Sequence, residues 1–209
     1  MIASLRPGAS WLDMHRRAER TILRALQEGG LLAGDAADVD AMIAADLGAV
    51  FMPHGLGHLI GIDTHDVGGY LAGTPPRVAR PGVDKLRTAR TLAPGMVITL
   101  EPGCYFIDIL LDRAAENPAQ ARYLNGDRLN DFRGFGGVRL EENILVTEEG
   151  CENLTTCPRA VSEILDVMGG GPWPPEEDVL PELRRNWVRN ENGNMVRYEI
   201  PCASGSKSD

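Results

Sequence analysis

The segment Phe51–Tyr70 constrains this chain more than any other part of it. Three of the chain's four histidines, His54, His58 and His65, lie in this segment among glycines and apolar residues. Neutral imidazole is a common metal ligand and titrates near physiological pH, so clustered histidines favour a metal or proton-transfer site. The bracketing glycines allow the backbone to turn tightly around such a site. The alternative interpretation is that these histidines are ordinary core residues with satisfied hydrogen bonds.

Two carboxylates extend the candidate site. Glu101 follows an apolar, β-prone run in a Glu-Pro-Gly turn, and Glu141 follows Arg139 by two residues in a second β-prone run. Residues two apart on one strand project to the same face, so we expect Arg139 and Glu141 side by side. One imidazole and two carboxylates suit Mn, Fe, Co or Zn better than Ca or Mg. Alternatively, Glu141 and Glu142 are edge-strand charges and Glu101 is a turn residue.

Local patterns in the rest of the chain predict a mixture of helices and strands, which is an α+β class. Ser10 and Asp13 form a capping-box pattern that begins a helix, and Gly29-Gly30 ends it. Further helices are expected at 39–47, at 112–124 with an interruption by Pro118, and at 161–168. Strands are expected at 96–100 and 138–147, where β-prone apolar residues gather.

A change of composition near residue 168 predicts a domain boundary. Residues 1–168 hold the motifs and the periodic apolar segments, whereas residues 169–209 begin with GGGPWPPEEDVLPE. A segment so rich in glycine, proline and acidic residues buries too little apolar surface to offset the entropy of ordering it. We therefore expect residues 169–209 to form a flexible tail.

Composition and charge exclude several classes of protein. The formal net charge of −9 argues against nucleic-acid binding, which needs clustered Lys and Arg. No apolar run approaches the roughly 20 residues that span a bilayer, and we see no signal peptide at the start. No C-x-x-C pairing occurs, so we expect reduced thiols in a cytoplasmic protein at the four cysteines, Cys104, Cys151, Cys157 and Cys202.

Three motifs in order resemble those of the prolidases, the Xaa-Pro dipeptidases of the pita-bread metallopeptidase family. They are FMPHGLGHLIGIDTHDVGGY, LRTARTLAPGMVITLEPGCYF and FRGFGGVRLEENILVT, and the resemblance runs from about Leu5 to Asp166. It implies that residues 1–168 form the second half of a pita-bread (creatinase/aminopeptidase-like) catalytic domain, with a curved antiparallel sheet and flanking helices. The implied activity is metal-dependent hydrolysis of dipeptides that end in proline.

The resemblance also implies a role for each matching residue. The implied metal ligands are His58, Glu101 and Glu141, of which Glu141 bridges two metal ions and Glu101 also moves the proton of the attacking water. The implied substrate-holding residues, which also stabilise the tetrahedral centre, are His54 and His65. Arg139 orients the bridging carboxylate, and Arg87 receives the free carboxylate of the dipeptide.

The family's dinuclear Mn²⁺ site has two further ligands, a pair of aspartates eleven residues apart on a hairpin that we expect upstream of Met1. Asp35 and Asp46 show the same spacing, but they lie in an alanine-rich, helix-prone stretch, and we interpret them as solvated helix charges. We therefore expect at most one well-held metal ion, with Zn²⁺ or Co²⁺ as alternatives to Mn²⁺.

Three hypotheses for the function remain. The first is a prolidase-like enzyme, impaired by the two absent aspartates, whose partner is a small dipeptide rather than nucleic acid or membrane. The second is a non-catalytic prolidase remnant that acts through protein–protein interaction, as a homodimer or by pairing with a full-length homologue through an exposed half-interface. The third is a metal-independent hydrolase like the creatinase relatives. We rank it last, because the chain keeps His58, Glu101 and Glu141.

Overall fold

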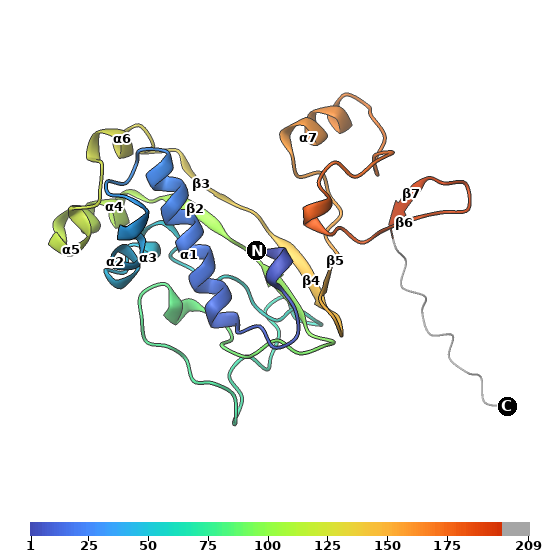
Figure 1. Ribbon diagram of the computed structural model, residues 1–209, viewed down its shortest axis with the longest axis horizontal. Helices are drawn as coiled ribbons and strands as arrows, with labels where there is room; N and C mark the ends of the chain where they lie inside the picture. Colours follow the sequence, from blue (N-terminus) through green and yellow to red (C-terminus); the bar gives the residue numbers. More distant parts are fainter. Residues whose placement is uncertain (198–209) are drawn as a thin grey trace.

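Short antiparallel sheets carry the fold in the computed structural model, which describes residues 1–197 (Figure 1). One sheet has the order β1-β4-β5, from strands Val97–Leu100, Glu142–Val146 and Cys151–Asn153. A second pairs β2, Gly103–Phe106, with β3, Gly136–Arg139. In β1 and β4, Leu100 lies opposite Glu142 and Val97 opposite Leu145. The strand expected at 96–100 is confirmed.

The helix α1, Trp11–Glu28, crosses the middle of the molecule in Figure 1. The hydroxyl of Ser10 accepts the backbone N–H of Asp13, which satisfies one of the free donors at a helix start. Gly29 caps the other end, so both predicted boundaries are confirmed. Apolar residues recur on one face of the helix, and Trp11 and Leu23 on that face are fully buried.

Shorter helices gather beside α1, on the left in Figure 1. They are α2, Val39–Ala44, α3, Gly48–Phe51, α4, Asp108–Glu116, α5, Pro118–Ala121, and α6, Gly126–Asn130. Proline divides α4 from α5 as expected, because Pro118 occupies the first turn of α5, where its missing N–H costs nothing. Single 3₁₀ turns lie at Ile2–Ser4, Ala36–Asp38, Val83–Lys85 and Pro181–Leu183.

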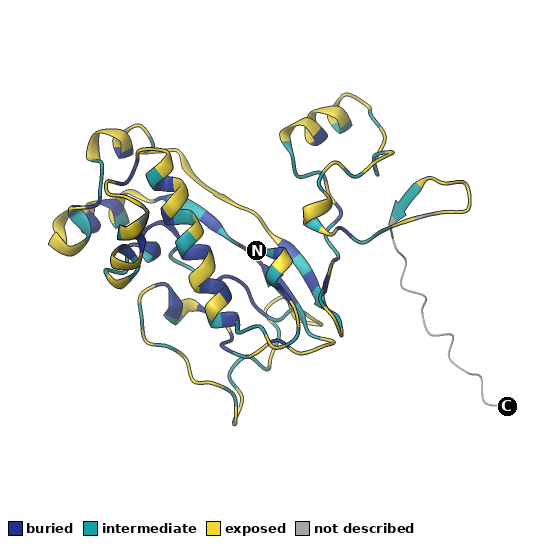
Figure 2. Cartoon of the chain, in the orientation of Figure 1, coloured by how far each residue is buried: buried dark blue, intermediate teal, exposed yellow. Residues whose placement is uncertain are grey.

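Two clusters of apolar side chains form the core, and their positions are among the buried ones coloured dark blue on the cartoon in Figure 2. One lies between α1 and the three-stranded sheet and includes Trp11, Leu56, Ile98 and Ile144. The other joins α1 to the short helices and to β2. Each large side chain that is fully buried contributes about 1.5–3 kcal/mol relative to exposure. The core therefore holds the end of β1, where the site lies, against α1.

The strand predicted at 138–147 is wrong as a single element. The chain instead forms two strands, because β3 pairs with β2 while β4 pairs with β1, and the chain changes partners at Leu140 and Glu141. The N–H of Leu140 donates to the carbonyl of Pro102, 3.0 Å away, which holds this break in place. Arg139 and Glu141 therefore do not share a strand face.

Residues 169–197 have more structure than the composition predicted. They include the hairpin of β6, Trp187–Arg189, and β7, Met195–Arg197, which lies on the right in Figure 1. Trp173 and Trp187 pack edge to face, with ring centroids 5.2 Å apart. The flexible tail and the domain boundary near residue 168 both stay predictions. Residues 198–209 of the expected tail lie outside the described residues.

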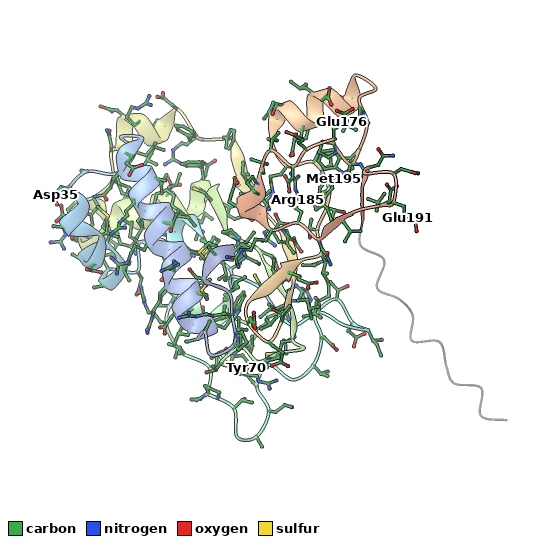
Figure 3. The ribbon with its side chains drawn as sticks, turned by 45° about the vertical axis from the view of Figure 1, so that its right-hand side comes forward. Asp35, Tyr70, Glu176, Arg185, Glu191 and Met195 are labelled. Carbon is green, nitrogen blue, oxygen red and sulfur yellow. The ribbon has the colours of Figure 1, made fainter. Side chains whose placement is uncertain are left out.

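A buried arginine fastens this C-terminal segment to the rest of the chain. Arg185, labelled in Figure 3, donates to Glu163 of helix α7, Val161–Met168, at 2.8 Å and also to Asp178. Its guanidinium lies 4.8 Å from the ring centre of Trp187. Such a pair is costly to break, because removing one partner leaves the other charge buried and uncompensated.

Within the described residues we find no helix with the length and apolar character that crossing a bilayer requires. Cys104, Cys151 and Cys157 are free thiols, and Cys202 lies outside the described residues. Burial raises the pKa of the Cys104 thiol to about 11, so this thiol is protonated at neutral pH and is a weak nucleophile.

We predict that Glu163→Gln destabilises the chain by about 3 kcal/mol at pH 7. Burial alone raises the pKa of Glu163, but hydrogen bonds from Arg185 and from the N–H groups of Arg159 and Ala160 outweigh it and lower the pKa to about 2. A lowered folded-state pKa gives stability that is complete above the ordinary value of 4.5 and is lost as the pH falls towards 2.

Urea unfolding between pH 7 and pH 2.5, followed by tryptophan fluorescence, measures this effect. The difference between wild type and Glu163→Gln should shrink below pH 4.5, whereas the exposed control Glu149→Gln should follow the wild type throughout. An equal difference at every pH would contradict the assignment.

Candidate functional site

The histidine segment reaches the site by pairing with strand β1. The N–H of Thr99 donates to the carbonyl of His58 at 2.9 Å, and the N–H of Ile60 donates to Val97 at 3.2 Å. The two stretches approach closely at Gly57, where a Cβ would lie 1.9 Å from the carbonyl oxygen of Thr99. Only glycine fits such a contact. This pairing places His58 beside the end of β1.

Glu101 is the centre of the site. Its carboxylate is buried and receives three neighbours: Nε2 of His58 lies 3.2 Å from Oε1, Nη1 of Arg139 donates to Oε2 at 3.0 Å, and the Thr99 hydroxyl donates to Oε1. The N–H of Glu101 donates to Leu56 at 2.7 Å, which fixes the backbone at the end of β1. A buried carboxylate is costly unless hydrogen bonds or opposite charges stabilise it, and here both of its oxygens have such partners.

The orientation of the His58 ring leaves Nε2 facing Glu101. Nδ1 of His58 lies 2.9 Å from the carbonyl of Leu59, which can only accept, so Nδ1 carries a proton. Nε2 then faces a carboxylate oxygen, and this contact is favourable when a proton on Nε2 or a metal ion lies between the two atoms. Metal-binding histidines commonly have this arrangement, in which the second nitrogen donates to a carbonyl. His58 and Glu101 thus fit a divalent metal as two of its ligands.

The other two histidines of the segment differ in their surroundings. The ring of His65 is exposed and packs edge to face on His58, with centroids 4.5 Å apart. His54 packs in the same way against Tyr105 at 5.4 Å, and its Nδ1 lies 2.8 Å from the carbonyl of Gly55. Burial is the main cause that lowers the pKa of His54, and the charge of Arg139 lowers it further. The Gly55 carbonyl and Glu101 raise this pKa, but by less. His54 is therefore neutral at pH 7, with Nε2 unprotonated.

A cavity of about 350 Å³ gathers these residues. Its lining consists of Pro53, His54, Gly55, Gly57, His58, His65, Lys85, Arg87, Glu101 and Arg139. Six of the seven predicted site residues thus line one cavity. The seventh, Glu141, is exposed in the break between β3 and β4 and is absent from this lining.

The loop that carries Arg87 is held by its own contacts. The hydroxyl of Tyr70, labelled in Figure 3, donates to the carbonyl of Leu86 at 2.9 Å, and the guanidinium of Arg77 lies 4.3 Å from the ring centre of Tyr70. A Cβ on Gly69 would lie 2.0 Å from the carbonyl oxygen of Arg87, so this residue must be glycine. The exposed Arg87 side chain is therefore anchored through its backbone at the cavity.

Glu142 rather than Glu141 is the buried carboxylate of the second motif. Asn153 donates to it at 2.9 Å, and it also pairs with Arg159. Strand β4 lies between β1 and β5, so the alternative interpretation of Glu142 as an edge-strand charge is wrong. Among residues 1–197, no group of three or more His, Cys, Asp or Glu side chains is arranged to hold a metal ion.

Three residues of the candidate site were not predicted from the sequence. Lys85 lines the cavity, Thr99 donates to Glu101, and Tyr105 contacts Arg139. Thr99 lies in β1, two positions before Glu101, which directly follows the strand, so its place on the same side was detectable from the alternation of side chains. The Tyr105 hydroxyl accepts from Nε of Arg139 at 2.7 Å, a contact between strands that the sequence does not reveal.

Asp35 and Asp46 support local structure elsewhere. The side chain of Asp35 accepts the N–H of Ala37 at the start of a 3₁₀ turn. Asp46 is not a solvated helix charge. Its carboxylate accepts from Nε of Arg80 at 2.6 Å, and its side chain is only 32% exposed.

The chain matches known proteins across most of its length. Residues 1–148 match the Metallopeptidase family M24. The Xaa-Pro dipeptidase of Homo sapiens is 56% identical over 170 residues, which cover 81% of this chain and 34% of that protein. A probable Xaa-Pro aminopeptidase of Aspergillus fumigatus is 38% identical over 164 residues, covering 78% of this chain and 34% of that protein. The chain thus spans about a third of the length of these relatives.

Solved structures lead to the same conclusion about the fold. The aminopeptidase PepP of Pseudomonas aeruginosa is 34% identical with a TM-score of 0.57, over 81% of this chain and 31% of that chain. Zinc-substituted aminopeptidase P of Escherichia coli, in complex with product, is 34% identical with a TM-score of 0.55 over the same shares. The expected α+β class and pita-bread architecture are confirmed, and the chain belongs to metallopeptidase family M24.

Proposed function

We propose that this chain takes part in metal-dependent hydrolysis of Xaa-Pro dipeptides. The observation that carries the proposal is the His58–Glu101 pair, with Nε2 and Oε1 3.2 Å apart, inside a cavity that also presents Arg87. The likeness to Xaa-Pro dipeptidases supports the substrate class. A cavity of about 350 Å³ lies at the lower end of the range for small-molecule sites, which suits a dipeptide.

His58 and Glu101 would hold the metal, whereas the ligand role expected for Glu141 stays a prediction, because its exposed side chain is absent from the cavity lining. We propose Mn²⁺ as the metal, with Zn²⁺ or Co²⁺ as alternatives, since one imidazole and carboxylates suit all three. A bound divalent ion lowers the pKa of a water ligand and polarises a carbonyl oxygen. Two protein ligands hold a metal more weakly than the three of a catalytic zinc site, so we propose that the described residues alone support impaired activity.

The remaining residues divide the work of binding and proton transfer. Arg87 would bind the free carboxylate of the substrate, because a guanidinium can bind a carboxylate through two hydrogen bonds. Glu101 would accept a proton and pass it towards the proline nitrogen, while Arg139 holds its other oxygen. His65, exposed at the cavity, is the better candidate to donate to a developing oxyanion, since Nε2 of neutral His54 has no proton to donate.

We predict that Mn²⁺ binds this chain at one weak site and that His58→Ala removes the binding. Isothermal titration calorimetry measures both. Loss of a direct ligand should weaken binding by more than the roughly 10–100-fold that loss of an outer-shell partner causes. Glu116→Gln, an exposed change on α4, serves as the control and should bind like the wild type. Unchanged binding in His58→Ala would exclude this residue as a ligand.

We predict that Arg87→Ala raises KM for Gly-Pro by about 10–100-fold with little change in kcat, because a charge-assisted hydrogen bond is worth about 1.5–3 kcal/mol. The comparison substrate is Gly-Pro amide, which lacks the free carboxylate. The variant should treat the two substrates alike, whereas Arg128→Ala on α6 should keep the wild-type preference. A preserved preference in Arg87→Ala would show that another group reads the carboxylate.

A second candidate function, protein–protein interaction, is favoured by one exposed apolar surface. Phe135, Val138 and Leu140 are 59%, 53% and 43% exposed along and beside β3. Among the described residues β3 pairs with β2 alone, so its second edge is free to add a strand. We propose that a second copy of the chain or a longer homologue covers this surface. A cytoplasmic location stays a prediction.

Sedimentation velocity over a range of concentrations tests this surface. We predict concentration-dependent association of the chain. The double variant Phe135→Ser/Val138→Thr should lower the association constant at least 10-fold, because the apolar surface it removes contributes about 1.4 kcal/mol or more to association. Met168→Ser on α7, which is 79% exposed, is the control. Association that only the control variant weakens would place the interface elsewhere.

A further inference from the structure

A groove of about 670 Å³ lies beside the candidate cavity and has no part in the function proposed above. Pro53 and Lys85 line both the groove and the cavity of about 350 Å³, so the two spaces meet at these residues. Pro53 directly precedes His54, and Lys85 lies two positions before Arg87. The groove therefore continues the cavity past Lys85, next to the segment whose Arg87 is proposed to bind the free carboxylate of a dipeptide.

Helix α4 and its C-terminal cap supply one wall of the groove. The lining side chains from this helix are spaced three and four residues apart and so share one helical face: Leu110, Arg113, Ala114 and Asn117. Ala49 and Val50 line the groove from α3. Alanine, valine, leucine and proline supply half of the lining residues. A ligand that fits this groove therefore has an apolar part.

Hydrogen bonds between separate segments hold the walls of the groove in place. Nε2 of Gln120 in α5 donates to the carbonyl of Ala45, at the end of α2, across 2.8 Å. Nε of Arg80 donates to Asp46 at 2.6 Å, which ties the loop at residues 79–85 to the same end of α2. The N–H of Asp84 donates to the carbonyl of Arg80 at 2.8 Å and tightens that loop. The groove is thus formed without a ligand, as small-molecule sites usually are.

The charges of the groove leave one guanidinium unpaired. Its charged lining residues are three cations and two carboxylates: Arg80, Lys85, Arg113, Asp46 and Asp84. Arg80 pairs with Asp46 at 2.6 Å, and Lys85 pairs with Asp84 at 2.8 Å. Arg113 is exposed and has no ion pair within residues 1–197. A free guanidinium beside apolar walls favours a ligand that carries a carboxylate, because the two planar groups can form a pair of hydrogen bonds.

We propose that the groove binds the part of a peptide that follows the proline, with Arg113 receiving the terminal carboxylate. A peptide longer than a dipeptide has an amide where the dipeptide has its free carboxylate. It therefore loses the contact proposed for Arg87 and gains one at Arg113, while the apolar walls hold the side chain near its end. The direction of the peptide rests on the proposed function, whereas the groove and its free guanidinium do not. Arg113 is then the residue that determines how well peptides longer than dipeptides bind.

Amide NMR of the 209-residue chain, with no metal added, tests the groove without hydrolysis. The probes are Gly-Pro, Gly-Pro-Leu and Gly-Pro-Leu-Leu, because each residue of an extended peptide adds about 3.3–3.6 Å of reach. We expect the peptides longer than Gly-Pro to shift the resonances of residues 110–117, and Gly-Pro to leave them in place. No shift there with any peptide, or an equal shift with Gly-Pro, would overturn the proposal. A chain that binds the longer peptides in this way but never hydrolyses Gly-Pro would contradict the proposed function alone.

Arg113→Ala tests the carboxylate contact in the same titrations. The wild type should bind Gly-Pro-Leu-Leu about 10–100-fold more tightly than the same peptide with a C-terminal amide, since hydrogen bonds to a charged group are strong. The variant should bind both forms alike. Arg24→Ala, the same change at an exposed arginine on α1, is the control and should keep the wild-type difference. A folded Arg113→Ala variant that still prefers the carboxylate form would overturn the assignment of Arg113.

Discussion

The pairing of the histidine segment with β1 is the interaction on which the site depends. Two backbone hydrogen bonds, from Thr99 to His58 and from Ile60 to Val97, align the segment with the strand. The close contact at Gly57 allows this alignment, because any side chain there would collide with the Thr99 carbonyl. A shift of one residue would turn His58 away from Glu101. The geometry of the centre is thus set by main-chain contacts and only completed by side chains.

The buried carboxylate of Glu101 has different neighbours at its two oxygens, Arg139 at Oε2 and His58 at Oε1. Arg139 and Thr99 donate to Glu101, and Nε2 of His58 lies where a proton or a metal ion can join it to the carboxylate. Burial without that cation is costly, so the affinity for a metal and the stability of this corner of the fold are linked. The same principle applies to Glu19 of α1, which has Arg80 nearby but no hydrogen bond to its carboxylate within residues 1–197.

Sequence reasoning succeeded where local chemistry decides the structure. The cap at Ser10 and the glycine at position 29 bound α1, and Pro118 separates α4 from α5, because each acts on its own stretch of backbone. The clustering of His54, His58 and Glu101 also followed from the motifs. Reasoning from strand alternation failed at Arg139 and Glu141, because the chain changes strand partners between them and alternation holds only within one strand.

The sequence by itself determined the family, the boundaries of α1 and six residues of one cavity, since motifs and caps are local signals. Only the tertiary structure decided which carboxylate of the Glu141–Glu142 pair is buried, because that depends on which strand lies opposite each residue. It also decided that Arg185 donates to Glu163 and that His15 and Glu19 are buried. These contacts join residues far apart in the chain, and no short pattern specifies such neighbours.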